Sequence, residues 1–151
     1  MKTLLFFVLI ITAGVASAQM DKKTWKQIPA GVTTIEVSNN KTAAENFAAI
    51  SELLLDNNFE IERRDAELGT INTNWQPMPR TGSYKLQIRC KDKLVIFTGQ
   101  FTFGVSIEVY GTRSENNPQQ IEKKGALMSA YGESFEGMYN VAAKYGEVSY
   151  R

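Results

Sequence analysis

The stretch from Tyr84 to Tyr110 reads YKLQIRCKDKLVIFTGQFTFGVSIEVY, and its hydrophobic pattern decides the fold class. Within Tyr84–Cys90 every second residue is apolar, which is typical of a β-strand with one buried face. Residues 91–93 are charged and predict a turn. From residue 94 onward the odd positions are apolar or glycine as far as Val109. The pattern therefore predicts one strand before the charged turn and a longer β segment after it.

The segment 94–110 is too long for one straight strand in a small domain. At about 3.3 Å per residue it would extend roughly 55 Å. A two-residue hairpin loop would move the apolar residues to the even positions, but the alternation continues unchanged through Gly99 and Gly104. We therefore favour one long strand bent at glycine, or two strands joined by a kink. A hairpin at Gly99-Gln100 is the alternative.

Cys90 ends the alternating series and falls on its apolar side, so we predict that its thiol is buried. It is the only cysteine, which rules out an internal disulfide bond and leaves core packing as the source of stability. The chain has no histidine to activate a thiol. The pattern therefore favours a structural cysteine over a catalytic one.

The residues on either side of this stretch predict further elements. A Thr-x-x-Glu capping box at Thr42 and Glu45 precedes an apolar helical stripe and predicts a helix that ends by Asp56. A second stripe near the C-terminus has apolar residues three or four positions apart, at Leu127, Tyr131, Phe135, Met138, Ala142 and Tyr145. The remaining expectations are strands at 33–37, 59–62 and 69–75, a turn at 65–67, a loop at 111–118 and a helix at 121–145.

Strands grouped together between two helices favour the α+β class with an antiparallel sheet. We expect about five strands and two helices in the order β-α-β-β-β-β-α. A helix-grip-like arrangement and a TATA-binding-protein-like arrangement both fit this order.

Part of the chain, residues 35–101, resembles a family of small exported bacterial proteins of unknown function. The similar segments are Ile35-Glu36-Val37, the helix with Phe47 and Leu54, Asp65 with Leu68-Gly69-Thr70-Ile71, and Phe97-Thr98-Gly99-Gln100-Phe101. An Asp-then-Gly-x-Ile pattern is also similar to the outer-membrane assembly lipoprotein of the BamC type. The resemblance implies a TATA-binding-protein-like fold. It implies no established activity and no catalytic residues.

The N-terminal residues have the order of a secretory signal peptide at 1–18. Lys2 is followed by an apolar run at 4–11 and then by Ala16-Ser17-Ala18, which fits signal peptidase. The apolar run is shorter than the roughly 20 residues of a membrane span. Position 19 is Gln rather than the cysteine that carries a lipid anchor. We expect an exported product without a membrane anchor, in the periplasm or secreted.

After cleavage, 18 fewer than 151 residues remain, which is 133 and enough for one domain. We expect residues 19–31 to form a polar tail that docks through Trp25, followed by a single α+β domain at 32–151. Lys2 is the only charged residue of the leader, so 16 basic residues then balance 16 acidic ones. A neutral chain lacks the basic surface of a nucleic-acid-binding protein.

The composition argues against an enzyme. Without histidine and with one cysteine, the chain lacks Ser-His-Asp and Cys-His catalytic sets and the usual zinc ligands. It has no glycine-rich phosphate loop and no dinucleotide fingerprint, so we expect no cofactor. A carboxylate hydrolase that uses Glu60 and Glu62 is the least favoured hypothesis, because a solvated strand edge explains these residues.

Our first functional hypothesis is a non-enzymatic extracytoplasmic domain that binds a protein or another envelope component. Its candidate contact residues are Trp75, Met78 and Arg80, because Trp and Arg are enriched in binding hot spots. The second hypothesis is a small apolar ligand held between the C-terminal helix and the sheet. Its candidate lining residues, which otherwise form a solid core, are Phe101, Phe103, Tyr131, Phe135 and Met138.

Export predicts a defined N-terminus. Because Ala18 occupies the signal-peptidase position, protein recovered from the periplasm or the medium should begin at Gln19. Intact-mass spectrometry with N-terminal peptide sequencing measures this directly. Recovery of chains that retain Met1 would contradict it.

Overall fold

A computed structural model describes residues 20–104, 108–109, 112–113 and 117–151. Its helices are α1 (Lys22–Gln27), α2 (Ala43–Asp56) and α3 (Ala130–Tyr145). Its first strands are β1 (Ile35–Ser38), β2 (Ile61–Asp65), β3 (Thr70–Thr73), β4 (Gln76–Pro77) and β5 (Gly82–Lys91). The later strands are β6 (Leu94–Phe103), β7 (Glu108–Val109), β8 (Thr112–Arg113), β9 (Gln119–Gln120) and β10 (Val148–Tyr150).

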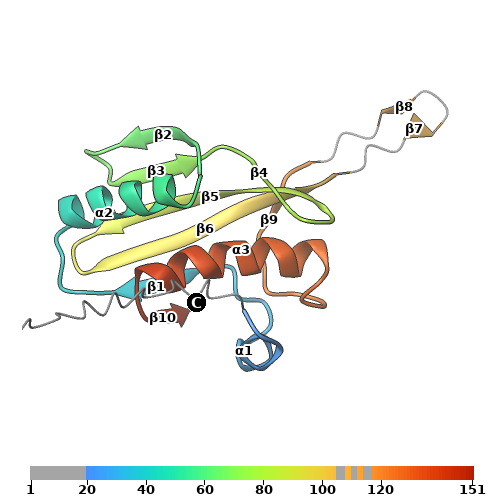
Figure 1. Ribbon diagram of the computed structural model, residues 1–151, viewed down its shortest axis with the longest axis horizontal. Coiled ribbons are helices and arrows are strands. Elements are labelled where there is room, and N and C mark those ends of the chain that lie inside the picture. The colour runs from blue at the N-terminus through green and yellow to red at the C-terminus, as the bar shows by residue number, and fades with distance from the viewer. Residues whose placement is uncertain (1–19, 105–107, 110–111, 114–116) are drawn as a thin grey trace, which may run out of the picture.

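The fold is α+β, and its main sheet has eight strands in the described part of the chain (Figure 1). The strands follow the order β10-β1-β6-β5-β3-β2, with β4 beside β5 and β9 beside β6, and every pair is antiparallel. The β5–β6 hairpin forms the centre and pairs all ten residues of each strand, from Gly82↔Phe103 to Lys91↔Leu94. The predicted fold class is therefore confirmed, with eight strands instead of about five and three helices instead of two.

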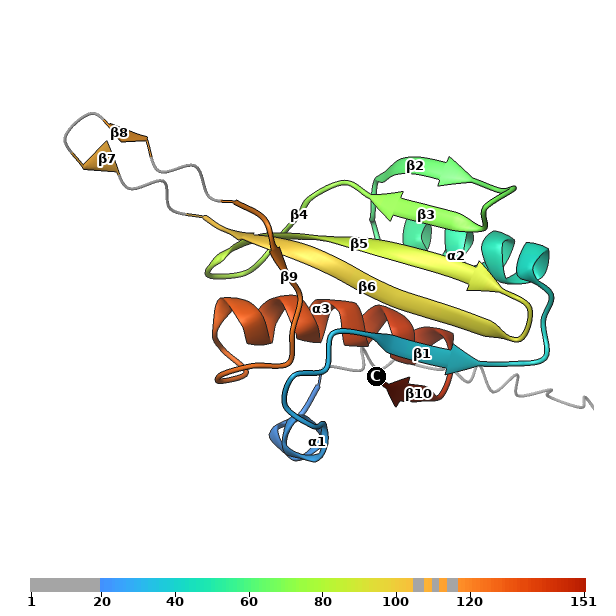
Figure 2. The same cartoon turned by 180° about the vertical axis from the view of Figure 1, so that it is seen from behind.

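One face of the sheet carries the core. The fully buried side chains of β1, β5 and β6 alternate with exposed or half-buried ones. Phe97 of β6, for example, pairs with Ile88 on the neighbouring strand β5 and with Ile35 on the neighbouring strand β1. Both α2 and α3 cover this face, so the domain has one helical layer and one β layer (Figures 1 and 2). The opposite face has polar side chains such as Lys85, Gln87 and Arg89, as the alternation predicts.

The capping box of α2 forms as predicted. The Thr42 side chain accepts from the Glu45 backbone, and the Glu45 carboxylate accepts from the Thr42 N–H at 2.8 Å. The charged turn between β5 and β6 also contributes, because the Asp92 carboxylate accepts from the Ala43 N–H at 2.8 Å. The helix start is thereby tied to the central hairpin.

β6 runs through Gly99 without a turn, so the alternative hairpin at Gly99-Gln100 is wrong. Gly99 is needed for a different reason: a Cβ there would lie 2.5 Å from the backbone oxygen of Lys85 on β5 and 2.7 Å from Cδ1 of Ile121. The strand ends at Phe103, whereas β7 pairs with β8 in a separate two-stranded sheet. The long bent strand to residue 110 is therefore not observed, and residues 105–107 and 110 lie outside the described residues.

Several elements were missed because they are too short to show a period. The expected tail at 19–31 contains α1, whose N-cap is Asp21. Trp25 docks as predicted, with its ring edge-on to Phe135 at 5.8 Å. β4 and β9 have two residues each and β10 has three. β10 pairs with β1 and becomes the edge of the main sheet.

The last helix begins at Ala130, so the predicted start at residue 121 is wrong. Ser129 caps α3 by accepting from the Gly132 N–H at 3.2 Å. The residues before it are bound to the sheet, since the Ile121 N–H donates to the Gly99 carbonyl at 3.0 Å. A backbone paired with β6 cannot also close helical hydrogen bonds.

Two further side-chain predictions have different outcomes. Cys90 is buried as predicted, and burial raises the pKa of its thiol to about 11. Phe103 was expected in the core or in a pocket but is 39% exposed, so that prediction is wrong. It is the last residue of β6, and its ring lies edge-on to that of Phe101 with the centroids 5.3 Å apart.

Truncating the central ring of α3 tests whether the layer under the helix is solid. Phe135 is fully buried, so Phe135→Ala should lower the free energy of unfolding by about 3–5 kcal/mol. Denaturant melts measure the loss. The control Leu55→Ala removes a side chain of α2 that is 57% exposed and should change stability by no more than about 0.5 kcal/mol. Equal losses in the two variants would show that α3 does not pack as described.

Candidate functional site

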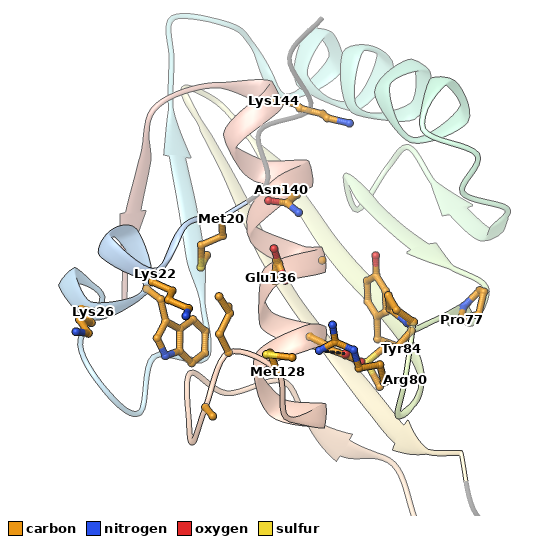
Figure 3. A pocket seen from close by; sticks show the side chains of 17 residues that line it. Met20, Lys22, Lys26, Pro77, Arg80, Tyr84, Met128, Glu136, Asn140 and Lys144 are labelled. Atoms are coloured by element: carbon orange, nitrogen blue, oxygen red, sulfur yellow. Dashed lines mark ion pairs between the residues drawn. The ribbon is translucent and has the colours of Figure 1, made fainter.

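A groove of about 810 Å³ crosses a second face of α3, beside the face that packs on the sheet. Three segments that are distant in the sequence form it: residues 20–26, residues 77–84, and residues 126–144. Figure 3 shows Met20 on one side of the helix and Tyr84 and Pro77 on the other, with Glu136 and Asn140 on the helix between them. The groove therefore exists only in the folded chain.

The walls of the groove are mainly apolar. Trp25 and Met20 contribute one wall, and Met78 and Tyr84 contribute the other. Met128, which is 63% exposed, lies just before the N-cap of α3. Three of the four methionines in the described residues line this one groove, and flexible thioether side chains suit surfaces that adapt to different ligands.

The floor of the groove is the α3 face with Glu133, Gly137, Asn140 and Lys144. Their spacing of four, three and four residues keeps them on one side of the helix. Gly137 allows the Tyr84 ring to approach closely, because a Cβ there would lie 2.5 Å from Cζ of Tyr84. Burial against the helix raises the pKa of the Tyr84 phenol to about 12, so it stays a neutral wall.

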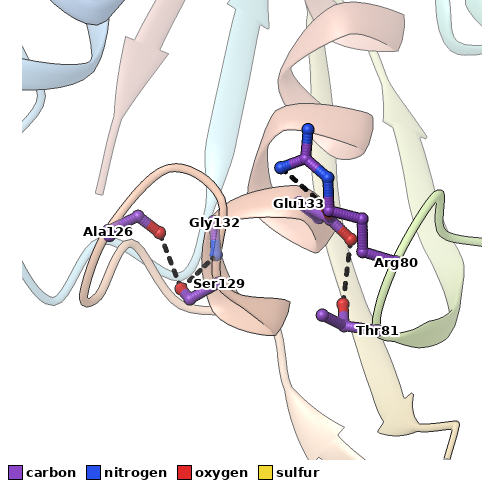
Figure 4. Close-up of polar contacts among 6 residues, drawn as sticks. All are labelled: Arg80, Thr81, Ala126, Ser129, Gly132 and Glu133. Atoms are coloured by element: carbon purple, nitrogen blue, oxygen red, sulfur yellow. Dashed lines mark hydrogen bonds and ion pairs between the residues drawn. The ribbon is translucent and has the colours of Figure 1, made fainter.

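Glu133 joins two of the segments (Figure 4). Its carboxylate accepts from Oγ1 of Thr81 at 2.9 Å and lies 3.8 Å from Nη1 of Arg80. The Glu133 side chain is 7% exposed, whereas that of Arg80 is 54% exposed. The hydrogen bond and the ion pair therefore hold the β4–β5 connection against the first turn of α3 and fix the width of the groove.

The centre of the groove has two polar groups, Glu136 and Asn140, among its apolar walls. Burial raises the pKa of Glu136, with a smaller contribution from the charge of Glu133; a hydrogen bond from the Met20 backbone and the charge of Arg80 oppose this. Oδ1 of Asn140, one turn further along α3, is buried without a hydrogen-bond partner among the described residues. The unsatisfied Asn140 oxygen favours a ligand that brings a hydrogen-bond donor or excludes water.

The basic residues of the groove differ in how they are engaged. Arg80 pairs with Glu133, and Nζ of Lys144 donates to Oδ1 of Asn57. Lys22 and Lys26 lie on exposed α1, and neither forms an ion pair within the described part of the chain. They are four residues apart, which is about one helical turn, and Figure 3 shows Lys22 nearer to the helix α3 than Lys26.

The structure separates the three residues predicted to contact a partner. Met78 and Arg80 line the groove, and Met78 is buried. Trp75 does not line it; its ring is 39% exposed and is covered by Nζ of Lys85 at 5.1 Å. The three residues therefore do not form one exposed patch.

The residues predicted to line a pocket between the helix and the sheet lie elsewhere. Phe101, Phe135 and Met138 are fully buried in the core, and Tyr131 packs edge-on against Phe101 at 4.9 Å. Phe103 lies at the rim, as described above. None of the five lines the groove, which lies beside the core rather than inside it.

Sequence reasoning missed Glu136, Asn140 and Lys144 because it followed only the apolar stripe of the last helix. A second stripe of the same helix could have indicated them, because Glu133, Gly137, Asn140 and Lys144 also recur at helical spacing. Glu133 in this stripe is buried. Met20 and the Lys22–Lys26 pair carried no signal, because only tertiary packing brings α1 to α3.

The described residues contain no cluster of three or more His, Cys, Asp or Glu side chains that could hold a metal ion. Over the same residues, no helix is both long and apolar enough to cross a membrane. Neither a known protein-family model nor a curated protein matches the chain. The chemistry of the groove is thus the main indication of function.

Glu136 predicts a pH-dependent gain in stability on substitution. Because its pKa in the native state is raised above the ordinary value of 4.5, the native state keeps the proton to a higher pH than the unfolded chain does. The free energy of unfolding therefore falls as the pH rises from about 4.5 through the raised native-state pKa. Near neutral pH the ionised carboxylate bears the full free-energy cost of partial burial, and Glu136→Gln removes that cost. Urea melts should therefore show a higher midpoint for Glu136→Gln at pH 7.

This advantage should disappear below about pH 4.5, where the glutamate is protonated in both states. Glu147→Gln, at an exposed position outside the groove, is the matched control and should change the midpoint little at either pH. An advantage for Glu136→Gln that is the same at pH 7 and at pH 4 would contradict the assignment.

Proposed function

We propose that this chain is a non-enzymatic binding domain whose groove across α3 holds a small, largely apolar ligand. The observation that supports this is the groove itself, with a volume of about 810 Å³ and apolar walls from α1, the β4–β5 connection and the start of α3. Ligand sites usually enclose about 300–1,000 Å³ and combine apolar walls with a few polar groups. Glu136 and Asn140 are such polar groups.

The shape of the walls supports a ligand more than a flat protein partner. Trp25 and Tyr84 are aromatic walls on opposite sides of α3, and the flexible side chains of the methionines that line the same groove can adjust to the ligand. Both walls are held in place independently of any ligand, by the ring contact of Trp25 with Phe135 and by the Glu133 bonds to the β4–β5 connection. A preformed groove loses little entropy on binding.

Binding of a protein or another envelope component through Trp75, Met78 and Arg80 is the less supported proposal. Protein interfaces depend on a compact cluster of anchors around a buried centre. Here Met78 is already buried inside the groove, while Trp75 is covered by Lys85 outside it.

Export to the periplasm or the medium is part of the proposal and is supported by the leader-like order of residues 1–18. A TATA-binding-protein-like or helix-grip-like fold is also proposed. Its support is that two helices lie on one face of a twisted antiparallel sheet whose central strands form the β5–β6 hairpin (Figure 1).

A charge placed in the groove should weaken binding of an apolar ligand. Met128→Asp puts a carboxylate on the groove wall, and we expect it to weaken binding of the neutral fluorescent probe N-phenyl-1-naphthylamine about tenfold or more, since the ligand must then desolvate the charge. Fluorescence titration of the purified chain measures the dissociation constant.

Leu68→Asp is the matched control. Leu68 has the same 63% exposure as Met128 but lies on the turn between β2 and β3, outside the groove. It should leave the dissociation constant of the probe within about twofold. A wild-type chain that does not bind the probe, or two variants that weaken it equally, would contradict the proposal.

A further inference from the structure

The lip of the groove on α1 carries two positive charges that form no ion pair with any described residue. Lys22 and Lys26 both line the groove and lie one helical turn apart. Like charges at this spacing repel each other and destabilise a helix. Among the described residues no acidic side chain forms an ion pair with either, and the first turn of α1 has no acidic residue. A bound anion would relieve this repulsion.

The centre of the groove has the opposite character. Glu136 and Glu133 lie on the α3 floor, and Arg80 forms an ion pair with Glu133 at 3.8 Å but only a weaker charge interaction with Glu136. A negatively charged group near Glu136 would be repelled in a partly buried environment, where charge interactions are stronger than in water. The charged end of a ligand with one negative charge is therefore repelled from the centre and attracted to the α1 lip.

The apolar walls determine what is attached to that charge. Beside the lysines of α1, the groove is lined by the apolar side chains of Trp25, Leu127, Met128 and Met78. An apolar chain lying along these residues buries its surface, while the head group stays at the exposed lysines. The arrangement thus separates a polar end from an apolar body, as a single-chain amphiphile does.

We infer that the groove binds a free long-chain carboxylate, with the carboxylate between Lys22 and Lys26 and the hydrocarbon chain along the wall from Trp25 to Met78. This inference rests on the proposed function of the groove and adds the class and orientation of its ligand. Two ammonium groups around one carboxylate give charge-assisted hydrogen bonds at the open end. The rest of the ligand makes apolar contacts.

The test compares tetradecanoate with tetradecan-1-ol, which has the same chain and no charge. Each displaces N-phenyl-1-naphthylamine from the purified chain at pH 7.5, below the concentration at which tetradecanoate aggregates. We expect tetradecanoate to bind about tenfold more tightly than the alcohol, which is the combined effect of two partly exposed charge contacts. Raising the salt concentration should reduce this difference.

Substitution of the lysines assigns the head group. The double variant Lys22→Gln/Lys26→Gln should bind tetradecanoate about tenfold more weakly and the alcohol unchanged. Lys23→Gln is the matched control, because Lys23 is an exposed residue of the same helix that does not line the groove. It should leave both dissociation constants within about twofold.

The outcomes separate the inference from the proposal beneath it. Equal binding of acid and alcohol, with no effect of the double variant, would overturn the carboxylate inference and leave an apolar ligand site. Failure of both compounds and of the neutral probe to bind would overturn the proposed function as well. If phosphatidylglycerol vesicles bind the chain and tetradecanoate does not compete with them, the inference is also overturned, because the occupant is then a membrane surface.

Discussion

The packing of α3 on β6 is the interaction on which the rest of the structure depends. Phe135 and Met138 are fully buried, as are Phe97 and Phe101 of the strand they cover. Since Cys90 is the only cysteine and no disulfide can form, this apolar layer must hold the two ends of the chain together. The N-terminal α1 is attached to the same layer, because Trp25 packs edge-on against Phe135.

A buried hydrogen-bond network fixes how the packed elements lie relative to one another. The Asn46 side chain on α2 is fully buried and donates to the Lys91 carbonyl at the end of β5 at 2.8 Å. Its Oδ1 accepts from the Asn39 side chain at 2.8 Å and from the Tyr145 hydroxyl of α3 at 2.5 Å. Because a buried amide is costly without partners, this network penalises any arrangement in which α2, α3 and the hairpin shift relative to one another.

The groove uses what the core leaves available on α3. One face of the helix is covered by the sheet, while the face with Glu133, Gly137 and Asn140 meets α1 and the β4–β5 connection at its sides only. Gly137 lowers helix propensity but allows Tyr84 to form a close wall, and Glu133 is buried in exchange for bonds that hold the other segment. These are local compromises of the kind expected at a functional site.

The sequence by itself determined the elements that have a clear period or cap: the β5–β6 hairpin, the burial of Cys90, the capping box of α2 and the stripe that packs α3 on the sheet. Alternation and helical spacing report which side of a segment is apolar, and that side is buried wherever the segment docks. Only the tertiary structure decided where α1, β4, β9 and β10 lie, since two to six residues carry no period. It also decided that α3 begins at Ala130, because Ile121 is already bonded to Gly99. The groove belongs to this second group: its residues come from segments up to about a hundred positions apart, and nothing in a linear pattern shows that Met20 and Tyr84 will face each other across Glu136.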